Sequence, residues 1–443
     1  GSLNPIKPGI GIEFDKFVTG QRFLGLQSVI LRNFLEDPSV LHESLTMRVF
    51  ERMGLPFQRT AFVKLYVNGT YVALYEMAEP IDSRFLLTRF GDDSGYLYEA
   101  QGGQFNHFQY VGDGPAPYVP TYYDPKNHTD NPQGEVIGAW MKAANLSTDA
   151  EFVSAVSKYT DLGALVAYAS AEVFMAELDG MMSTGGMTNF YLYRRPSDDR
   201  FYVLPWDKEM TFGSPQWPIF QYVNDNVLLR RALQVPALRQ RYLDTMHEAA
   251  EAIGGPGGWL ETEVNREYSV VRDAVILDPA RVCLVDGAQA RCPIEFFDAN
   301  VAYVRRFAQD RAAFVNAALA AEGWKETPGV PSLTLGVVMN AASGDPVLSR
   351  VRHAPVKWFG YLSTTGVYGD RGGGWVDESD APNPGQARSR YRLAAEQEWQ
   401  VLGRKAGVPL AIFRLPAIYG PGRSALEQVL EGRAQCVDKP GQV

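Results

Sequence analysis

The stretch from Glu177 to Gly213 constrains this chain most, because it predicts a β-hairpin with polar side chains at both of its ends. Residues Asn189–Arg194 and Arg200–Pro205 alternate between apolar and polar side chains, as half-buried strands do. The polar turn Pro196-Ser197-Asp198-Asp199 joins them. A chain with this element needs a sheet that can accept the hairpin, and it must place whatever flanks the two strands side by side.

Three residues surround the predicted hairpin in a fixed order: Asp179 before it, Asn189 at its start and Asp207 directly after it. Protein kinases use a loop Asp to accept the proton of the acceptor, an Asn beyond it, and an Asp after a hairpin to bind the metal. Mg²⁺ prefers oxygen ligands and takes few of them from protein. Each residue alone is more often a turn former. The ordered set therefore carries the hypothesis of phosphoryl transfer.

Size and composition describe a globular protein of two or three domains. The chain has 443 residues, 46% of them hydrophobic, and a net charge of −9. No apolar run reaches about 18 residues, so no membrane span is expected. The negative charge argues against a nucleic-acid partner. The chain begins at Gly1 and ends just after Lys439-Pro440-Gly441, and both ends are expected to be cut, so the compartment cannot be read from a missing signal peptide.

The cysteines and histidines favour no metal site. Cys283 and Cys292 are close enough to form a disulfide in an exported protein, and two unpaired thiols are an equal alternative. The five histidines are scattered without the spacing of zinc ligands, so no zinc site is expected.

Residues 1–100 predict a small lobe of strands around one helix. The expected elements are strands at Ile10–Phe14 and Gly25–Leu31, a helix that starts at Asp37-Pro38 and stops at Gly54, and strands at Thr60–Val67 and Thr70–Met77 around the Asn68-Gly69 turn. In the amino-terminal lobe of a kinase, which has this order, a basic residue on an early strand pairs with a helix Glu to hold phosphates. Lys7 and Glu43 are the candidates for that pair.

Residues 101–324 predict a larger, mainly helical lobe. Gln101–Thr129 is rich in Gly, Pro, Tyr and Asn and is expected to be an irregular insertion. Asp161–Leu178 has apolar residues at helical spacing and leads directly to Asp179. Val227–Ala252 and Asp298–Ala320 are further amphipathic helices, whose apolar faces are expected to be core.

Five segments of residues 1–320 resemble the spore-coat-protein-H (CotH) kinase family: GIEFDKFVTGQRFLGL, DPSVLHESL, GLPFQRTAFVKLYVNGTYVALYEMAEPIDSRF, DGMMSTGGMTNFYLYR and LPWDKEMTFG. The resemblance implies an α+β fold with the two lobes of an atypical protein kinase. It further implies binding of ATP with Mg²⁺, and phosphorylation of secreted or coat proteins on Ser. By position, Asp179 would be the catalytic acid, Asn189 and Asp207 metal ligands, and Glu43 the partner of the lysine. An exported or cell-surface location is implied as well.

The sequence departs from the family pattern in the small lobe and in the metal segment. Glu209 stands where the family often has a second Asp, and it is the third candidate metal ligand. Gly11 stands where a Lys is common, which leaves Lys7 as the nearest base. Only Gly1-Ser2 remains of the phosphate loop, so the small lobe is expected to be truncated. The alternative is a non-catalytic coat or surface interaction protein that keeps the kinase-like fold.

The character of the chain changes after a polar linker at residues 325–331. The apolar strands TLGVVM and FGYLSTTGVYG, the helix Gln386–Ala406 and the strand Pro409–Arg414 predict part of a parallel α/β sheet in residues 332–443. YLSTTGVYGD and FRLPAIYGPGR resemble NAD-dependent epimerases of the extended short-chain dehydrogenase type. By position, Thr364 would match the catalytic Ser/Thr and Tyr368 the motif tyrosine.

Two features of such enzymes are missing from this segment. No GxGxxG-type loop precedes it, and the Tyr-x-x-x-Lys pair falls on Arg388 and Arg392. We therefore expect residues 332–443 to be a partial Rossmann-like fragment. The alternative is a bifunctional chain that binds NAD(P) through Thr364 and Tyr368.

Overall fold

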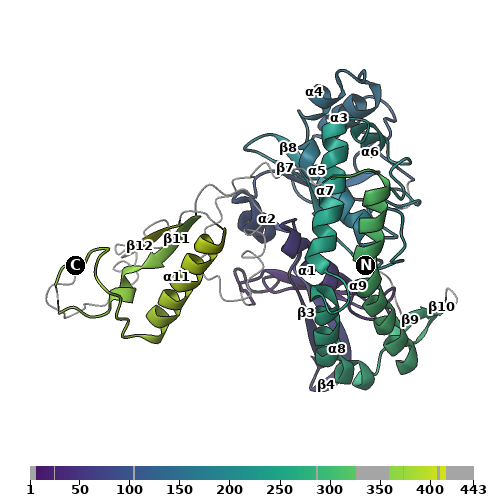
Figure 1. The fold of residues 1–443 in the computed structure, drawn as a ribbon. Coiled ribbons are helices and arrows are strands. Elements are labelled where there is room, and N and C mark those ends of the chain that lie inside the picture. The colour runs from purple at the N-terminus through teal and green to yellow at the C-terminus, as the bar shows by residue number, and fades with distance from the viewer. Residues whose placement is uncertain are drawn as a thin grey trace. The chain divides into compact units, whose positions relative to one another are not determined.

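The computed structural model of this chain describes residues 6–23, 25–102, 105–285, 288–325, 359–372, 374–406 and 410–415. They belong to two units, Gly1–Lys325 and Glu326–Val443, and both units combine helices with strands, as predicted (Figure 1).

The small lobe is built on an antiparallel sheet with the strand order β1-β2-β4-β3. Its strands are β1 (Ile10–Glu13), β2 (Ser28–Arg32), β3 (Thr60–Val67) and β4 (Thr70–Ala78). Asn68 and Gly69 have φ angles of 50° and 81°, which the tight turn between β3 and β4 requires. The predicted hairpin is therefore confirmed.

Helix α1 (His42–Met53) follows β2 and starts later than predicted. The carboxylate of Asp37 accepts the N–H groups of Ser39, at 2.9 Å, and of His42, at 2.7 Å. Asp37 thus closes a turn ahead of the helix, as Asp side chains often do. The predicted end is confirmed, because Gly54 caps the helix in the left-handed conformation.

The larger lobe contains a second sheet, with the strand order β6-β5-β7-β8. Its strands are β5 (Tyr96–Ala100), β6 (Tyr123–Pro125), β7 (Phe190–Arg195) and β8 (Arg200–Pro205). The pair β7–β8 confirms the predicted hairpin. The predicted irregular insertion is wrong in one respect, since β6 lies within it and pairs with β5.

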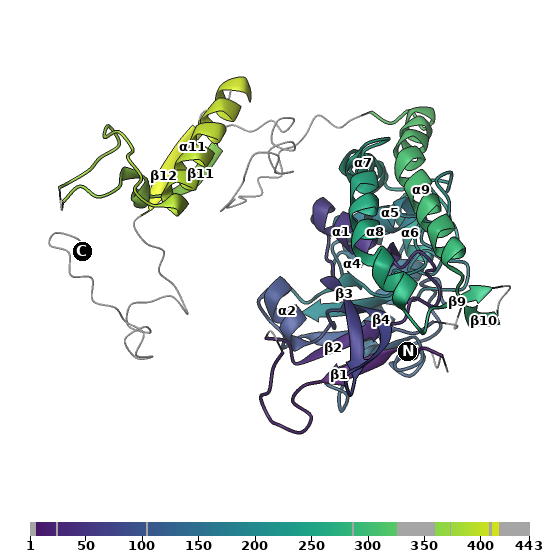
Figure 2. The same ribbon diagram turned by 90° about the horizontal axis from the view of Figure 1, so that it is seen from below.

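Helices make up the rest of the first unit. They are α2 (Ser83–Phe90), α3 (Gly134–Leu146), α4 (Phe152–Val156), α5 (Leu162–Phe174), α6 (Val227–Ala232), α7 (Pro236–Ile253), α8 (Trp259–Leu277) and α9 (Ile294–Ala321). The buried helix α5 packs on α7, and α7 packs on α9 (Figure 2). One long helix predicted over residues 227–252 is two, because Pro236 starts α7 at its first turn.

Helix α5 ends at Phe174, earlier than the predicted Leu178. The guanidinium of the fully buried Arg311, on α9, donates to the carbonyl oxygens of Phe174, at 2.8 Å, and Val173, at 3.2 Å. Arg311 thereby supplies a donor to the carbonyl of Phe174 and a second donor to that of Val173, which also accepts the N–H of Ala176. Asp179 therefore lies in the loop after α5 and not on the helix itself.

The short strands β9 (Val282–Val285) and β10 (Ala288–Arg291) pair between α8 and α9. A disulfide joins Cys283 to Cys292, and both sulfur-bearing residues are buried. Of the two alternatives for these cysteines, the structure has the disulfide.

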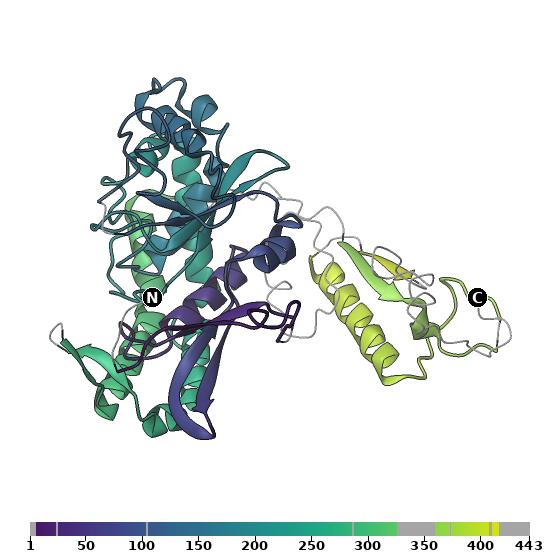
Figure 3. The same ribbon diagram turned by 180° about the vertical axis from the view of Figure 1, so that it is seen from behind.

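In the second unit, β11 (Phe359–Thr364) leads through the short 3₁₀ turn η1 (Thr365–Tyr368) to helix α11 (Ala387–Ala406) and then to β12 (Leu410–Leu415). The two strands are parallel, and α11 contacts both (Figure 3). The predicted parallel α/β arrangement is confirmed. The predicted strand TLGVVM and the segment IYGPGR lie outside the described residues.

Candidate active site

Asp179, Asn189 and Asp207 come together where the β7–β8 hairpin begins and ends. Asn189 precedes β7, and its side-chain nitrogen donates to the carbonyl oxygen of Asp179, at 2.7 Å, and to its carboxylate, at 3.1 Å. Asp207 follows β8, and the backbone N–H of Trp206 donates to the carbonyl of Asn189. Asn189 and Asp207 have φ angles of 57° and 53°. The chain therefore turns in the left-handed conformation at Asn189 before β7 and at Asp207 after β8, the two predicted metal ligands.

Arg32, at the end of β2, is the basic residue of this cluster. Its guanidinium forms an ion pair with the carboxylate of Asp207 and lies over the ring of Trp206, 4.4 Å from the centroid. Its Nε atom is 4.0 Å from a carboxylate oxygen of Glu43 on α1. Arg32 therefore lies between the helix acid of the small lobe and the acid that follows the hairpin.

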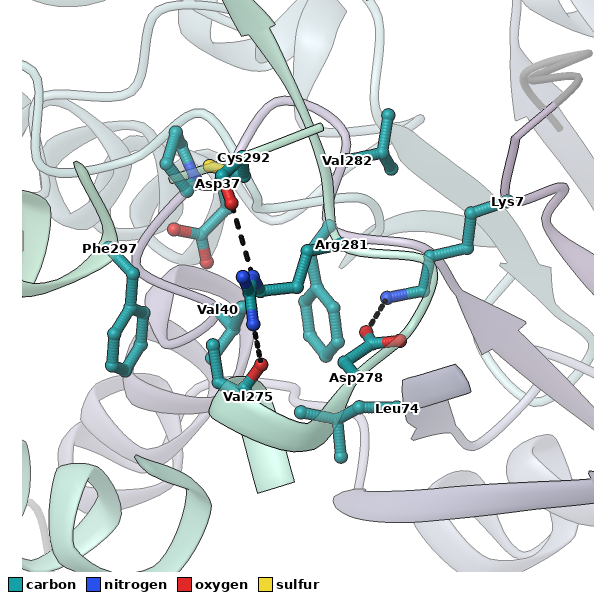
Figure 4. A pocket seen from close by; sticks show the side chains of 12 residues that line it. Lys7, Asp37, Val40, Leu74, Val275, Asp278, Arg281, Val282, Cys292 and Phe297 are labelled. Atoms are coloured by element: carbon teal, nitrogen blue, oxygen red, sulfur yellow. Dashed lines mark hydrogen bonds and ion pairs between the residues drawn. The ribbon is translucent and has the colours of Figure 1, made fainter. Parts of the chain in front are cut away.

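The predicted pairing of Lys7 with Glu43 is wrong. Lys7 lies ahead of β1, and its ammonium is 3.0 Å from the carboxylate of Asp278, just after α8 (Figure 4). Both side chains are 2% exposed. The adjoining cavity of about 20 Å³ is close to the size of one water molecule. A buried pair in such a small space has no room for a nucleotide.

The sheet order explains this correction. Helix α1 follows β2, so the strand that delivers a side chain to Glu43 is β2, whereas Lys7 precedes the neighbouring strand β1. The signal for Arg32 was present in the sequence, because SVILR is the apolar strand next before the helix and ends in a base. The resemblance drew attention to Gly11 and hence to Lys7.

The carboxyl groups around Asp207 influence one another. Burial raises the pKa of Asp179, and nearby Asp207 raises it further, against Lys208. Burial and then Asp207 raise the pKa of Glu209 well above its usual value. Burial raises the pKa of Glu36, to which Asp207 and Asp179 add. Like charges at close range disfavour each other's ionised form, and a cation would relieve that repulsion.

The residues fit Mg²⁺ better than a metal held by protein alone. In the described part of the chain, no three His, Cys, Asp or Glu residues are arranged as a metal site. Mg²⁺ commonly binds one or two carboxylates and takes its other ligands from water and phosphates. Asn189 uses its nitrogen to donate to Asp179, so its amide oxygen keeps acceptor capacity. The structure brings Glu209 near Asp207 but does not complete a three-acid site with it.

Buried polar atoms without partners lie at the same place. Within the described residues, Nε and Nη2 of Arg32 and Oε1 of Glu43 have no hydrogen-bond partner. A buried donor left unsatisfied costs about 1–3 kcal/mol, so such groups in a native fold need an explanation. A phosphate oxygen is the partner that a guanidinium binds well. Nε of Arg32 faces Oε1 of Glu43 at 4.0 Å, so Nη2 is the donor of Arg32 that is left for a phosphate oxygen.

Sequence reasoning missed a buried ionic cluster beneath these residues. Lys208, directly after Asp207, is 0% exposed, and its ammonium is 2.7 Å from Glu172 and 3.7 Å from Glu177. The sequence gave no sign of it, since Lys208 stands among acids in a segment that reads as an exposed turn.

The second unit uses the hydroxyl groups of its motif residues internally. The side chain of Thr364 accepts the N–H of Gly366 at 3.2 Å. The hydroxyl of the buried Tyr368 accepts a hydrogen bond from Arg414 at 2.8 Å, and Arg414 is paired with Glu396 at 2.7 Å. The predicted role of Thr364 and Tyr368 in NAD(P) binding stays a prediction.

Residues 286–438 match the NAD dependent epimerase/dehydratase family. Among solved structures, the chain is similar to Shewanella oneidensis HipA, from a complex with HipB and operator DNA, with a TM-score of 0.31 and 14% identity over 72% of this chain and 66% of that one. It is also similar to the Helicobacter pylori proinflammatory kinase CtkA, with a TM-score of 0.29 and 9% identity over 68% and 94%.

Two of the curated proteins to which this chain is similar are a spore coat protein and an invasin. The inner spore coat protein H of Bacillus subtilis (strain 168) is 22% identical over 306 residues, which are 68% of this chain and 80% of that protein. The invasin CotH3 of Rhizopus delemar is 26% identical over 191 residues, 41% of this chain and 31% of the invasin. Residues 10–315, more than half of the chain, match the CotH kinase protein family, and the chain belongs to that family.

Proposed function

We propose that residues 1–325 act as a protein kinase that transfers phosphate from ATP, with Mg²⁺, to a Ser hydroxyl of a protein acceptor. One observation carries the proposal. Arg32, which is paired with Asp207, keeps a buried donor at Nη2 without a hydrogen-bond partner among the described residues, and Asp207 lies beside the hydrogen-bonded pair of Asp179 and Asn189. A nucleotide with its metal would supply an acceptor for this donor and a cation for the acids around Asp207.

Each residue then has a role that its position allows. Asp207 and the amide oxygen of Asn189 would hold Mg²⁺, which would supply positive charge to the phosphates. Arg32, supported by Glu43, binds phosphate oxygens. Asp179 accepts the proton of the Ser hydroxyl as the Ser oxygen bonds to the γ-phosphorus of ATP. The bond from that phosphorus to the β–γ bridging oxygen breaks, and this oxygen leaves on the β-phosphate of ADP. A base with a raised pKa suits this step.

We further propose a coat or cell-surface location. The Bacillus relative is a spore coat protein and the Rhizopus relative an invasin by name. The disulfide between Cys283 and Cys292 supports an oxidising compartment. No helix among the described residues is long and apolar enough to cross a bilayer.

A specific contact favours the second candidate, a non-catalytic surface interaction protein. The ion pair between Arg32 and Asp207 engages the carboxylate that the kinase proposal assigns to the metal. If this pair does not open, the site takes no Mg²⁺ and the kinase fold serves only as a scaffold.

Calorimetric titration of the full chain with ATP, with and without Mg²⁺, separates the two candidates. The kinase proposal expects saturable binding that requires Mg²⁺, followed by transfer of radiolabelled phosphate to a Ser-containing protein. Absence of binding at millimolar ATP and Mg²⁺ contradicts the kinase proposal and leaves the interaction protein.

A further inference from the structure

We propose that Lys208 is a positioning residue, which fixes the segment carrying Asp179 relative to Asp207. The inference rests on the proposed function, because it assigns a purpose to a buried cation within that same site. Nothing in the chemistry of phosphoryl transfer itself requires a lysine there.

The ammonium of Lys208 lies among side chains that surround it from α5 and from the loop after it. Glu172 on α5 is 2.7 Å away and Glu177 in the loop is 3.7 Å away, and all three side chains are 0% exposed. Tyr168, one turn before Glu172, donates its hydroxyl to the same Glu172 oxygen at 3.2 Å. One ammonium group therefore contacts two buried acidic side chains at once.

These two carboxylates in turn bind the backbone on both sides of Asp179. Glu177 accepts the N–H of Asp179 at 3.1 Å, and Glu172 accepts the N–H of Met182 at 3.1 Å. A Cβ atom at Gly180 would lie 2.7 Å from a Glu172 oxygen and 2.6 Å from Glu177 Cγ. The loop that carries Asp179 is thus wound closely around the carboxylates that Lys208 holds.

The backbone of Lys208 is bound from the opposite side by α1. Glu43 accepts its N–H, and the hydroxyl of Thr211 donates to its carbonyl oxygen at 2.9 Å. Thr211 is itself hydrogen-bonded to Thr46 of α1 at 2.8 Å. The backbone of Lys208 therefore connects Asp207, its neighbour in the chain, to α1. The side chain of Lys208 connects to Asp179 through Glu177, which accepts the N–H of Asp179.

A merely structural ion pair is the competing explanation, and it makes a different prediction. Buried ion pairs can often be replaced by apolar or neutral groups without loss of stability. If Lys208 only fills the core, such a replacement keeps both the fold and the activity. If it positions Asp179, the replacement keeps the fold but misplaces the base, and an error of about 1 Å can cost about 10²-fold in rate.

The test uses the full chain with the double substitution Lys208→Met/Glu172→Gln, which removes one buried positive and one buried negative charge. The matched control is Lys7→Met/Asp278→Asn. That pair is also buried, but it lies between the segment before β1 and the end of α8. We expect both variants to melt within a few degrees of the wild type. Only the Lys208 variant loses turnover, by about 10²-fold, with its KM for ATP changed by less than about threefold.

Amide hydrogen exchange supplies a readout that does not depend on activity. We expect the peptide over residues 177–182 to lose protection in the Lys208 variant and to keep it in the control. If wild-type protein transfers no phosphate, the proposed function fails, and this exchange result still decides whether Lys208 fixes the segment. Wild-type turnover, or wild-type exchange at 177–182, overturns the inference.

A second variant covers the case in which the double substitution does not fold. Glu177→Leu leaves the 2.7 Å contact of Lys208 with Glu172 in place, and it removes the acceptor of the Asp179 N–H together with the 3.7 Å contact of Lys208 with Glu177. We expect a folded protein with turnover lowered about 10-fold and faster exchange at the Asp179 amide. Unchanged turnover together with unchanged exchange overturns the inference on this variant alone.

Discussion

The two units of this chain both carry residues that match a family motif, but they treat those residues differently. In the first unit, Nη2 of Arg32 is buried without a hydrogen-bond partner in the described part of the chain, and the pKa of Asp179 is raised by burial and by Asp207. In the second unit, Thr364 accepts an N–H from its own turn and Tyr368 accepts a hydrogen bond from Arg414. The first arrangement has a buried donor that a ligand could bind, whereas the hydroxyl groups of Thr364 and Tyr368 are already hydrogen-bonded within the second unit.

The comparison shows that a motif match gives the position of a residue but not its availability. Native folds satisfy nearly all buried polar groups, so groups left unsatisfied mark places where a ligand completes the structure. Carboxyl groups whose pKa is shifted by burial and by a nearby charge also mark candidate functional sites. On both counts the first unit has a candidate site. If this difference is functional, only the first unit binds a ligand.

The largest expected effect is on metal-dependent binding in the first unit. We expect Asp207→Ala to abolish Mg²⁺-dependent ATP binding, a loss of at least about 100-fold in affinity, because no second strong ligand replaces it. The control is Asp198→Ala in the β7–β8 turn, which removes an acid paired with Arg195 and leaves the site intact. Calorimetry with both variants decides, and equal affinities would show that Asp207 is not a ligand.

The next effect is on the chemical step. We expect Asp179→Asn to lower turnover by about 10²–10⁴-fold, the usual contribution of a general base, while ATP affinity stays within a few-fold of the wild type. The Asn oxygen can still accept from Asn189, so the loop keeps its contact. A radiolabelled transfer assay measures turnover. Wild-type rates in this variant would remove Asp179 from the mechanism.

A smaller effect separates the two basic residues. We expect Arg32→Met to raise the KM for ATP by about 10–100-fold, because the phosphates lose a charge-assisted partner. Lys7→Met should leave that KM unchanged and lower the melting temperature, since it leaves Asp278 buried and unpaired. The opposite pattern in steady-state kinetics and thermal melts would restore Lys7 as the phosphate ligand.

Elements fixed by local chemistry were predicted from the sequence. The Asn68-Gly69 turn and the β7–β8 hairpin follow from turn residues and alternation within a few positions. Elements that depend on distant partners were not. Helix α5 stops at Phe174, where Arg311, far along the chain, supplies donors to its last carbonyls. No local pattern carries that information.

The residues of the candidate site also divide into those set by local sequence and those set by distant partners. Asp179, Asn189 and Asp207 were found because their order around one hairpin is a local property. The base facing Glu43 was misassigned, because its identity depends on which strand lies next to α1. Lys208 was missed because burial of a lysine depends on the carboxylates that three-dimensional packing brings to it, and these come from α5 and the loop after it.

A pH effect tests the electrostatics beneath the site. Burial, partly offset by Lys208, raises the pKa of Glu177 from 4.5 to about 8, and Glu172 and Asp179 add to the rise. The folded state therefore holds a proton that the unfolded state releases, so stability falls as pH rises from about 4.5 to about 8, by at most about 1.4 kcal/mol per unit. We expect Glu177→Gln to flatten this fall in urea unfolding between pH 5 and 8. Parallel curves for the two proteins would exclude Glu177 as its source.

The smallest expected effect concerns the second unit, where we expect no response to NAD(P). A cofactor at 100 times its Kd would stabilise its domain by about 2.7 kcal/mol, a shift that scanning calorimetry of the full chain resolves easily. Tyr368 has its hydroxyl bound by Arg414, and freeing it would leave the pair of Arg414 with Glu396 without its third member. We expect Thr364→Ala to cost only about 1 kcal/mol, the usual effect of losing a turn-capping hydroxyl. An NAD(P)-dependent rise in melting temperature that Tyr368→Phe abolishes would instead make this chain bifunctional, and the difference between the two units would disappear.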